Sequence, residues 1–365
     1  MCSVCQDGHP AGDRRQPIVF ASGLLLIVAC VQTPADELNT APAGTGRTGA
    51  DYLSQVPPGT TPVRFAPDNI KPDGSDYPVP RGPYFGQSPP GMTPEVFATG
   101  IVSGDTYFEH SSPSFSPDGR AVYWSVLTVH NGRRDEKIMF TELRDSGWTK
   151  PQVAPFNKEH HGGGLAFSPD GKLLYFYSAR PFHRDEDGFT ENIWALELDG
   201  GKHSEPFKLD SVISSHEHSE RSPSFSSNGT MYFDRGRAGT IDIYRAKHIN
   251  GQYQEPEKLG AEVNTSASEY APCIAPDESF LVFSRFVDDE SGKSVKLYVS
   301  FKRADGSWTK ARCLGDKLPL CNRARFPGLS PDGKYLFFCA HKDGRPDVYW
   351  VDARVLDELK PDELK

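Results

Sequence analysis

A short hairpin motif that recurs five times is the feature that most constrains the fold of this 365-residue chain. Its first copy carries Ser-Pro-Asp-Gly at residues 116–119. Proline presets the first corner of a tight turn, aspartate bonds its own backbone, and glycine accepts positive φ. Because an apolar run at residues 122–124 follows the turn, the motif predicts a β-hairpin.

The five copies are marked by the aspartate or asparagine of the turn. These residues are Asp118, Asp170, Asn228, Asp277 and Asp332. In the fourth copy Glu278 replaces the glycine, so this turn is expected to be different or strained. Each turn leads into a nearly unbroken apolar run, such as residues 173–177, and then into a further strand. Such runs predict strands that are buried on both faces.

Four short strands in each repeat predict an all-β fold, a β-propeller of four-stranded blades over residues 94–352. A Gly-x-aromatic-x-x-Pro signature announces the fourth strand, as at residues 251–256. Five repeats are counted directly. A sixth blade would need residues 61–93, whose prolines argue against central strands. The N-terminal strand that begins at Pro94 is expected to complete the last blade and close the ring.

The first 30 residues have the plan of an exported protein. Arg14 and Arg15 precede an apolar run, residues 18–29, that is too short to span a bilayer comfortably, so residues 1–29 are predicted to be a signal peptide. The run ends Leu-Ile-Val-Ala-Cys, which resembles the lipobox of bacterial lipoproteins. That resemblance implies cleavage before Cys30 and a diacylglycerol on its sulfur. An ordinary signal peptide with a chance cysteine is the alternative.

The segments outside the propeller have simpler assignments. Residues 30–60 form the lipidated cysteine and a flexible tether, 61–93 an irregular Pro-rich lead-in, and 353–365 a short helical tail. Export permits disulfides, and Cys313 and Cys321 flank one short loop, so they are the predicted pair. The residue after Cys30 is not the aspartate that retains lipoproteins in the inner membrane of enteric bacteria. We therefore expect a lipoprotein in the periplasm or at the cell surface, with the outer membrane favoured.

The repeated hairpin also resembles a known family. The pattern Ser-Pro-Asp-Gly-x-x-Leu-Tyr-Phe at residues 168–176, with a later Asp-Ile-Tyr at 242–244, is similar to the PD40, or WD40-like, repeat of TolB-type propellers. The resemblance covers residues 94 to 352. It implies an exported bacterial propeller that often serves as a binding module. TolB-like domains are usually six-bladed, which keeps six blades open beside the direct count of five.

Polar residues gather just before the predicted innermost strands. The candidate ligand-binding residues are Glu109, His110, His160, His161, His216, His218, Glu220, Glu269, Arg323 and Arg325. Because these segments of a propeller meet around one rim, we expect them at the mouth of the central channel. Imidazoles and carboxylates gathered there would suit a divalent metal or an acidic sugar. The plainer interpretation is that such loops are polar anyway and that a recurring glutamate caps the loop backbone.

Several function classes are excluded by the sequence. The net charge is −9 with mixed signs, and no basic stripe points to a nucleic acid. The chain has no Gly-x-Ser-x-Gly elbow, phosphate loop or dinucleotide fingerprint. We therefore predict a lipid-anchored, non-catalytic binding or scaffold propeller without cofactor, which recognises an envelope protein or glycan and touches the membrane only through its anchor. The alternatives are a metal-assisted lyase or hydrolase acting on acidic oligosaccharides, as in some TolB-like pectate-fragment lyases, and a purely structural envelope protein.

Overall fold

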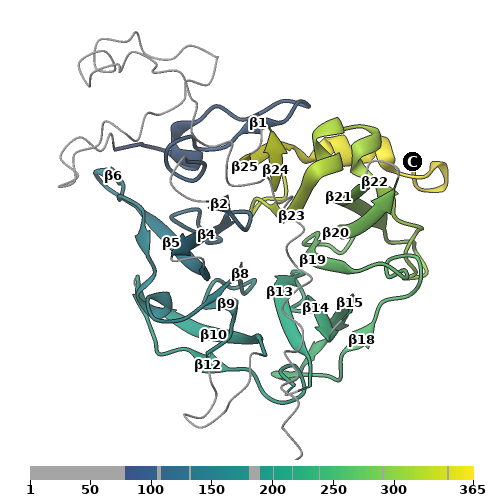
Figure 1. The fold of residues 1–365 in the computed structure, drawn as a ribbon, viewed down its shortest axis with the longest axis horizontal. Helices are drawn as coiled ribbons and strands as arrows, with labels where there is room; N and C mark the ends of the chain where they lie inside the picture. Colours follow the sequence, from purple (N-terminus) through teal and green to yellow (C-terminus); the bar gives the residue numbers. More distant parts are fainter. Residues whose placement is uncertain are drawn as a thin grey trace, which may run out of the picture.

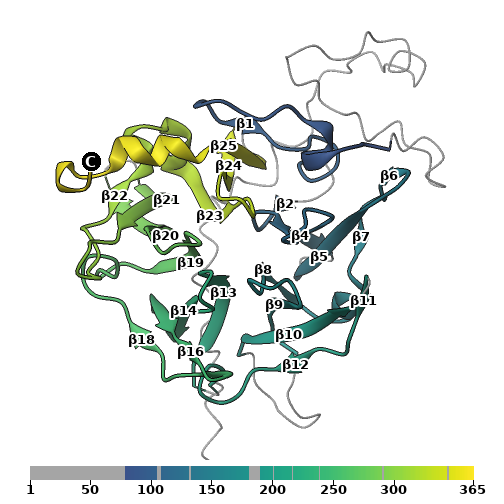
Figure 2. The ribbon, with the colours of Figure 1, turned by 180° about the vertical axis from the view of Figure 1, so that it is seen from behind.

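The chain folds into a ring of five antiparallel blades (Figures 1 and 2). This computed structural model describes residues 79–104, 108–130, 133–180, 190–199, 201–215, 217–237, 239–289, 292–342 and 345–365. The strand nearest the centre comes first in each blade, and the chain then steps outward. The predicted all-β propeller is confirmed, and the count of five blades is correct.

The blades are numbered 1 to 5 in chain order, and their strands follow. Blade 1 has β2 (Phe108–Glu109), β3 (Ser114–Phe115), β4 (Ala121–His130), β5 (Arg133–Arg144), β6 (Gly147–Trp148) and β7 (Gln152–Val153). Blade 2 has β8 (Gly162–Phe167), β9 (Leu173–Ser178), β10 (Asn192–Asp199), β11 (Lys202–His203) and β12 (Phe207–Lys208). Blade 3 has β13 (Ser219–Phe225), β14 (Met231–Arg237), β15 (Thr240–Ala246), the hairpin β16 (His248–Ile249) with β17 (Gln252–Tyr253), and β18 (Glu257–Lys258).

The last two blades are simpler. Blade 4 has β19 (Glu269–Ile274), β20 (Phe280–Asp289), β21 (Gly292–Phe301) and β22 (Arg312–Cys313). Blade 5 has β23 (Ala324–Leu329), β24 (Tyr335–Lys342), β25 (Arg345–Asp352) and, from the other end of the chain, β1 (Glu95–Val96). Short 3-10 helices connect these elements: η2 (Pro83–Gly86), η3 (Pro155–Asn157), η4 (Leu314–Asp316), η5 (Pro319–Arg323), η6 (Ala353–Leu359) and η7 (Asp362–Leu364). In the described part of the chain, no helix has the length and apolar character needed to cross a membrane.

The ring closes as the sequence predicts. Strand β1 pairs antiparallel with β25, with Val96 opposite Tyr349. The next residue, Phe97, is completely buried, and its ring centroid lies 5.1 Å from that of Trp350. The closure therefore joins backbone pairing to aromatic packing, and β1 covers the outer edge of β25.

Each blade is buried on both faces because it packs between two neighbours. In β9, Leu174 and Phe176 belong to the apolar cluster shared with blade 1, whereas Tyr175, between them, belongs to the cluster shared with blade 3. Five such clusters fill the five interfaces between blades. Alternate residues of one strand thus serve two different cores, which explains the unbroken apolar runs in the sequence.

The hairpin turns repeat one set of hydrogen bonds. The serine hydroxyl donates to the turn aspartate or asparagine in four copies: Ser116 to Asp118 (2.5 Å), Ser168 to Asp170 (2.7 Å), Ser226 to Asn228 (2.9 Å) and Ser330 to Asp332 (2.7 Å). In the fourth turn Glu278 adopts φ 60°, the strain that the missing glycine predicts. Its carboxylate accepts a hydrogen bond from Ser226 (2.9 Å) in the turn of the preceding blade.

A bulge distorts the inner strands at equivalent points. The pairing register shifts between Gly163 and Ala166, Arg221 and Ser224, Tyr270 and Cys273, and Arg325 and Gly328. A residue inside each bulge has positive φ: Gly164, Ser222, Ala271 and Phe326. Three of these are not glycine, and such backbone strain concentrates at functional sites. The bulge ends the ladder locally and turns the following residues toward the ring centre.

Segments outside the blades pack on the ring. In the described part of the Pro-rich lead-in, Phe85 lies 4.6 Å (ring centroids) from Trp148, whose indole nitrogen donates to the Gly82 carbonyl (2.8 Å). The C-terminal segment after β25 forms η6 and η7, separated by Pro361, and Leu356 is buried against blades 4 and 5. The predicted signal peptide, Cys30 and the tether lie outside the described residues.

Candidate functional site

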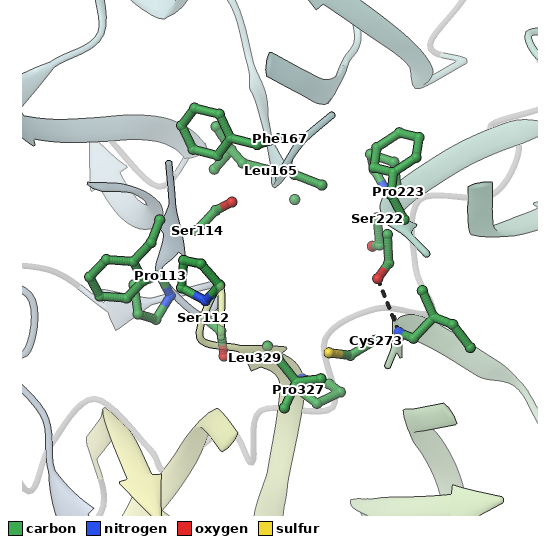
Figure 3. Close-up of a pocket in the computed structure, with 18 of the residues that line it drawn as sticks. Ser112, Pro113, Ser114, Leu165, Phe167, Ser222, Pro223, Cys273, Pro327 and Leu329 are labelled. Carbon is green, nitrogen blue, oxygen red and sulfur yellow. Dashed lines mark hydrogen bonds between the residues drawn. The ribbon is translucent and has the colours of Figure 1, made fainter. Parts of the chain in front are cut away.

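A central cavity of about 270 Å³ is lined by the inner strands of all five blades. Figure 3 shows Ser114, Phe167, Pro223, Cys273 and Leu329 around it, one from each blade. The fourth residue before each turn aspartate or asparagine is small in every repeat: Ser114, Ala166, Ser224, Cys273 and Gly328. Small side chains at this position hold the centre of the ring open.

The cavity wall mixes hydroxyl groups with apolar surface. Several hydroxyls also join neighbouring blades: Ser112 Oγ donates to the Phe326 carbonyl, and Ser224 Oγ accepts from the Ile274 N–H (3.1 Å). The remaining wall is made of proline and aromatic or aliphatic side chains, such as Pro113 and Phe167 (Figure 3). A wall that combines apolar surface with polar groups in fixed positions is typical of a binding site.

A buried carboxylate, Glu136 in β5, lies between blades 1 and 2 against Gly163 in β8. This end of the inner strands, opposite the hairpin turns, is called the mouth below. Its Oε2 accepts a hydrogen bond from the Tyr177 hydroxyl (2.5 Å) and lies 3.1 Å from His110 Nδ1. Burial opposes its charge, but the His110 imidazole and the hydrogen bond from Tyr177 lower the pKa of Glu136 to about 2. Gly163 is required opposite it, because a Cβ there would collide with the Glu136 carboxylate.

His161 connects Glu136 to a second carboxylate. The Glu136 N–H donates to His161 Nδ1 (3.2 Å), so the imidazole proton sits on Nε2, which lies 3.4 Å from Glu191 Oε1. Burial opposes protonation, yet the Glu191 and Glu136 carboxylates raise the pKa of His161. The two histidines predicted from sequence, His110 and His161, therefore do meet, at a glutamate that the sequence analysis did not single out.

The same network continues into blade 3 through Arg221. Its guanidinium lies 3.0 Å from Glu191 Oε2 and 3.5 Å from Asp234 Oδ1. Asp234 in turn accepts from the N–H of Ala271 (3.1 Å), which is the bulge residue of blade 4. Burial is the largest influence on Asp234 and raises its pKa, although the Arg221 charge favours the ionised form. A continuous polar chain thus links blades 1 to 4 around the mouth.

Two predicted site residues, Glu220 and Glu269, are fully buried in matching ion pairs. Glu220 accepts from Ser215 Oγ (2.8 Å) and Arg235 Nε (3.1 Å). Glu269 has Thr265 Oγ1 (2.7 Å) and Arg285 Nε (2.7 Å) in the same roles. The loop N–H groups of Ser215 and Thr265 also donate to these carboxylates. This geometry favours the simpler interpretation, in which a recurring glutamate caps the loop backbone.

The other predicted residues are scattered. Glu109 is buried, and its Oε1 accepts from the Gly104 N–H (2.8 Å). His160 lies in the turn after η3, and His218 Nδ1 lies 3.4 Å from Ser215 Oγ, so neither joins the Glu136 network. Arg323 is exposed and Arg325 is half-buried. His216 lies outside the described residues.

The described residues contain neither the predicted disulfide nor a cluster of metal ligands. Cys313 and Cys321 are free thiols, not the predicted disulfide, because Cys321 is buried in the apolar cluster of blades 4 and 5 while Cys313 Sγ faces Asn322 Oδ1 (3.8 Å). Among the described residues, no group of three or more His, Cys, Asp or Glu side chains is placed to hold a metal ion. His161 Nδ1, the nitrogen nearest Asp135, already accepts a backbone N–H.

Sequence reasoning missed the residues that link one blade to the next. These are Glu136, Tyr177, Glu191, Arg221 and Asp234. One signal was available: Glu136 and Glu191 both occupy the residue just before the predicted third strands of their repeats. Each of these glutamates contacts the inner strand of the following blade, a relation that becomes visible only once the ring is built.

Comparison with known proteins gives likenesses of fold alone. No family model matches the chain, and no curated protein matches it in sequence. TolB from Acinetobacter baumannii is 17% identical with a TM-score of 0.42, over 66% of this chain and 51% of that one, so the match spans about half of its length. Bacillus subtilis arabinanase Arb43A is 12% identical with a TM-score of 0.44, over 69% and 95% of the two chains.

A second enzyme is also among these neighbours. Oligogalacturonate lyase from Vibrio parahaemolyticus is 14% identical with a TM-score of 0.39, over 74% of this chain and 75% of that one. Each similarity is one of fold at low identity, and none bears on what this chain binds. The structural neighbours include TolB, an arabinanase and an oligogalacturonate lyase, so the functional argument rests on the site itself.

Proposed function

We propose that this chain is a binding propeller that takes up a segment of an envelope protein or glycan in its central cavity, through the polar mouth. The observation that carries this proposal is the cavity itself, to which all five inner strands contribute small residues. A ring needs no such opening for stability, since larger side chains at those five positions would pack it shut. An open, rigid cavity of mixed polarity is suited to recognition.

The mouth supports binding better than catalysis. A general base works best with a pKa near the operating pH, and the pKa of Glu136 is about 2. Burial raises the pKa of Glu220 to about 7, the useful range, but that carboxylate is fully buried and bonded to Ser215 and Arg235. These groups hold the mouth in one geometry, which lowers the ordering cost of binding.

Filling the cavity tests the proposal. The full chain is screened by thermal denaturation against peptidoglycan fragments, oligosaccharides and peptides, in parallel with an Ala166→Phe variant and a Ser307→Phe control on an exposed loop. A ligand of the cavity raises the midpoint of wild type and control in step with its concentration, and leaves Ala166→Phe unchanged. Ligands that act equally on all three proteins would place recognition elsewhere and refute the cavity as the site.

The cellular location of the protein is a separate part of the proposal. Residues 1–29 act as a signal peptide, Cys30 carries the lipid, and residues 31–60 hold the propeller away from the membrane, facing the periplasm or the cell surface. The five hairpins are degenerate PD40 repeats. Replacing Cys30 by serine should release the protein from the membrane fraction and abolish labelling with a radioactive fatty acid. Retention and labelling of the serine variant would contradict the lipid anchor.

A further inference from the structure

Two arginines occupy the same position in blades 3 and 5. Arg221 and Arg325 each lie seven residues before the turn residue, and each stands just before the bulge of its inner strand. The chain surrounds them differently. Arg221 has carboxylates on two sides, Glu191 from the preceding blade (3.0 Å) and Asp234 from its own blade (3.5 Å).

Neither carboxylate has a counterpart around Arg325. The residue opposite Arg221 in the sheet is Asp234, whereas the residue opposite Arg325 is Cys339. Asn192, the residue after Glu191, pairs with Ser178 in blade 2, and Lys296 pairs with Arg285 at the equivalent point of blade 4. The residue of blade 4 that corresponds to Glu191 is therefore Val295, which precedes Lys296. The repeat therefore keeps the cation and replaces both anions by uncharged side chains.

In the part of the chain that the structure describes, the Arg325 guanidinium forms no ion pair. Its Nε atom is completely enclosed and has no hydrogen-bond partner. Glu109, whose charge opposes that of Arg325 at the Cys339 thiol, accepts a hydrogen bond from the Gly104 N–H (2.8 Å). A partly desolvated cation without a counter-ion is costly, so the arrangement calls for an anion from outside the chain.

The other groups around Arg325 also favour a bound anion. Burial and the charges of Arg325 and Arg323 lower the pKa of His341, so a second arginine adds positive charge near this imidazole. The guanidinium carbon lies 5.3 Å from the ring centroid of Phe326, which lines the cavity. The Phe326 ring also lies 4.9 Å from that of His110. An anion bound at Arg325 would thus sit at the rim, next to the aromatic wall of the cavity.

We propose that Arg325 is the anchor for a carboxylate group of the ligand that enters the central cavity. A carboxylate matches the planar fork of a guanidinium and would reproduce at Arg325 the environment that the chain itself builds around Arg221. One half-buried guanidinium balances one negative charge, which suits a carboxylate better than a doubly charged phosphate. This inference rests on the proposed function, because it adds a charge requirement to the ligand of the same cavity.

A pair of probes that differ only in charge tests the inference. Benzoate and benzamide share an aromatic ring and a planar end group, and only benzoate carries the carboxylate. The purified full chain is titrated with each at neutral pH and constant ionic strength, and dissociation constants are taken from the rise of the denaturation midpoint. We expect benzoate to bind at least about tenfold more tightly than benzamide, as one charge-assisted bond requires.

Variants assign the effect to Arg325. Arg325→Gln should weaken benzoate by about tenfold and leave benzamide unchanged. Arg120→Gln, which removes an exposed arginine of a hairpin turn, should change neither. Because Arg325 forms no ion pair in the described part of the chain, Arg325→Gln should keep the midpoint of the ligand-free protein. Arg325→Lys, which keeps the charge without the fork, should retain an intermediate affinity and serves if the glutamine variant does not fold.

Four outcomes would overturn the inference: equal binding of benzoate and benzamide, no benzoate binding at all, an Arg325→Gln variant with unchanged benzoate affinity, or inorganic phosphate binding more tightly than benzoate. None of these would touch the cavity proposal, which fails only if Ala166→Phe leaves every ligand bound. A ligand that is lost in Ala166→Phe and insensitive to Arg325 would keep the cavity as the site and remove the carboxylate from it.

Discussion

The two ends of each inner strand behave differently in this propeller. At the turn end, four of the five repeats use the same serine-to-aspartate or serine-to-asparagine hydrogen bond, for example Ser168 to Asp170 (2.7 Å). At the mouth end the blades share less. Blades 3 and 4 repeat one buried pair, Glu220 with Arg235 and Glu269 with Arg285. Otherwise they differ: Glu136 meets two histidines, Arg221 meets two carboxylates, and Arg325 forms no ion pair in the described part of the chain. Repetition thus marks the scaffold, and departure from it marks the surface that recognises something else.

The difference also separates local from long-range stabilisation. Apart from the bond of Ser226 to Glu278, each turn is held by residues within five positions of each other, so its loss affects mainly one hairpin. The mouth is held by side chains that cross from one blade to the next, such as Glu191, which lies 3.0 Å from Arg221 and 3.4 Å from His161. Substitutions at the mouth should therefore lower the free energy of unfolding more than substitutions at a turn.

The largest expected effect is that of Glu191→Ala. It leaves the 14%-exposed Arg221 side chain with Asp234 as its one acidic partner, and breaking a buried pair in this way should lower the free energy of unfolding by about 3 kcal/mol. The matched control is Glu257→Ala, whose 53%-exposed carboxylate pairs with Arg245 and should cost under about 1 kcal/mol. Urea unfolding measures both. Equal losses would mean that the mouth network contributes no more than a surface pair.

A smaller effect is expected from pH, through Glu136. Its pKa is lowered from an ordinary value near 4.5 to about 2, so its contribution is fully present above pH 4.5 and is lost as the pH falls through 2. The shift corresponds to about 3 kcal/mol in total, of which about 2 kcal/mol should be gone by pH 3.

The measurement compares wild type with Glu136→Gln across that range. The difference between their free energies of unfolding, taken from urea titrations at pH 6, 5, 4 and 3, should shrink steadily below pH 5. Glu257→Gln, from the exposed pair with Arg245, is the control and should show a much weaker slope. A wild-type advantage that stays constant down to pH 3 would show that the buried carboxylate keeps an ordinary pKa.

Sequence reasoning succeeded where the determining residues are close in the chain. The turn chemistry, the five blades and the closure by β1 follow from short patterns, because each needs only one hairpin or one strand. It also framed the alternatives for Glu220 correctly, since capping of the loop backbone was one of them, and the structure shows that bond to Ser215.

The mouth could not be predicted in the same way. Glu136 and Tyr177 are 41 residues apart and meet because blade 2 follows blade 1 around the ring. The bulges that open the centre place Ser222 and Phe326 at positive φ, and neither residue type announces that conformation. Propensity at these positions is overridden by the closure of the ring, so the strained residues are found only in the structure.

The smallest expected effect lies at the turn end, in the fourth repeat, where the glycine is replaced. Glu278 holds φ 60° and bonds Ser226 (2.9 Å) with its carboxylate, so alanine and glycine both remove the side-chain bond but only alanine keeps the backbone strain. Glu278→Gly should therefore be more stable than Glu278→Ala by about 1 kcal/mol. Urea unfolding of the two variants gives the difference directly, with Gly333→Ala, at φ 69° in the last turn, as a second estimate of the same strain. If the glycine and alanine variants of Glu278 were equally stable, the fourth turn would have relaxed to another shape, and the turn end would be less uniform than its hydrogen bonds indicate.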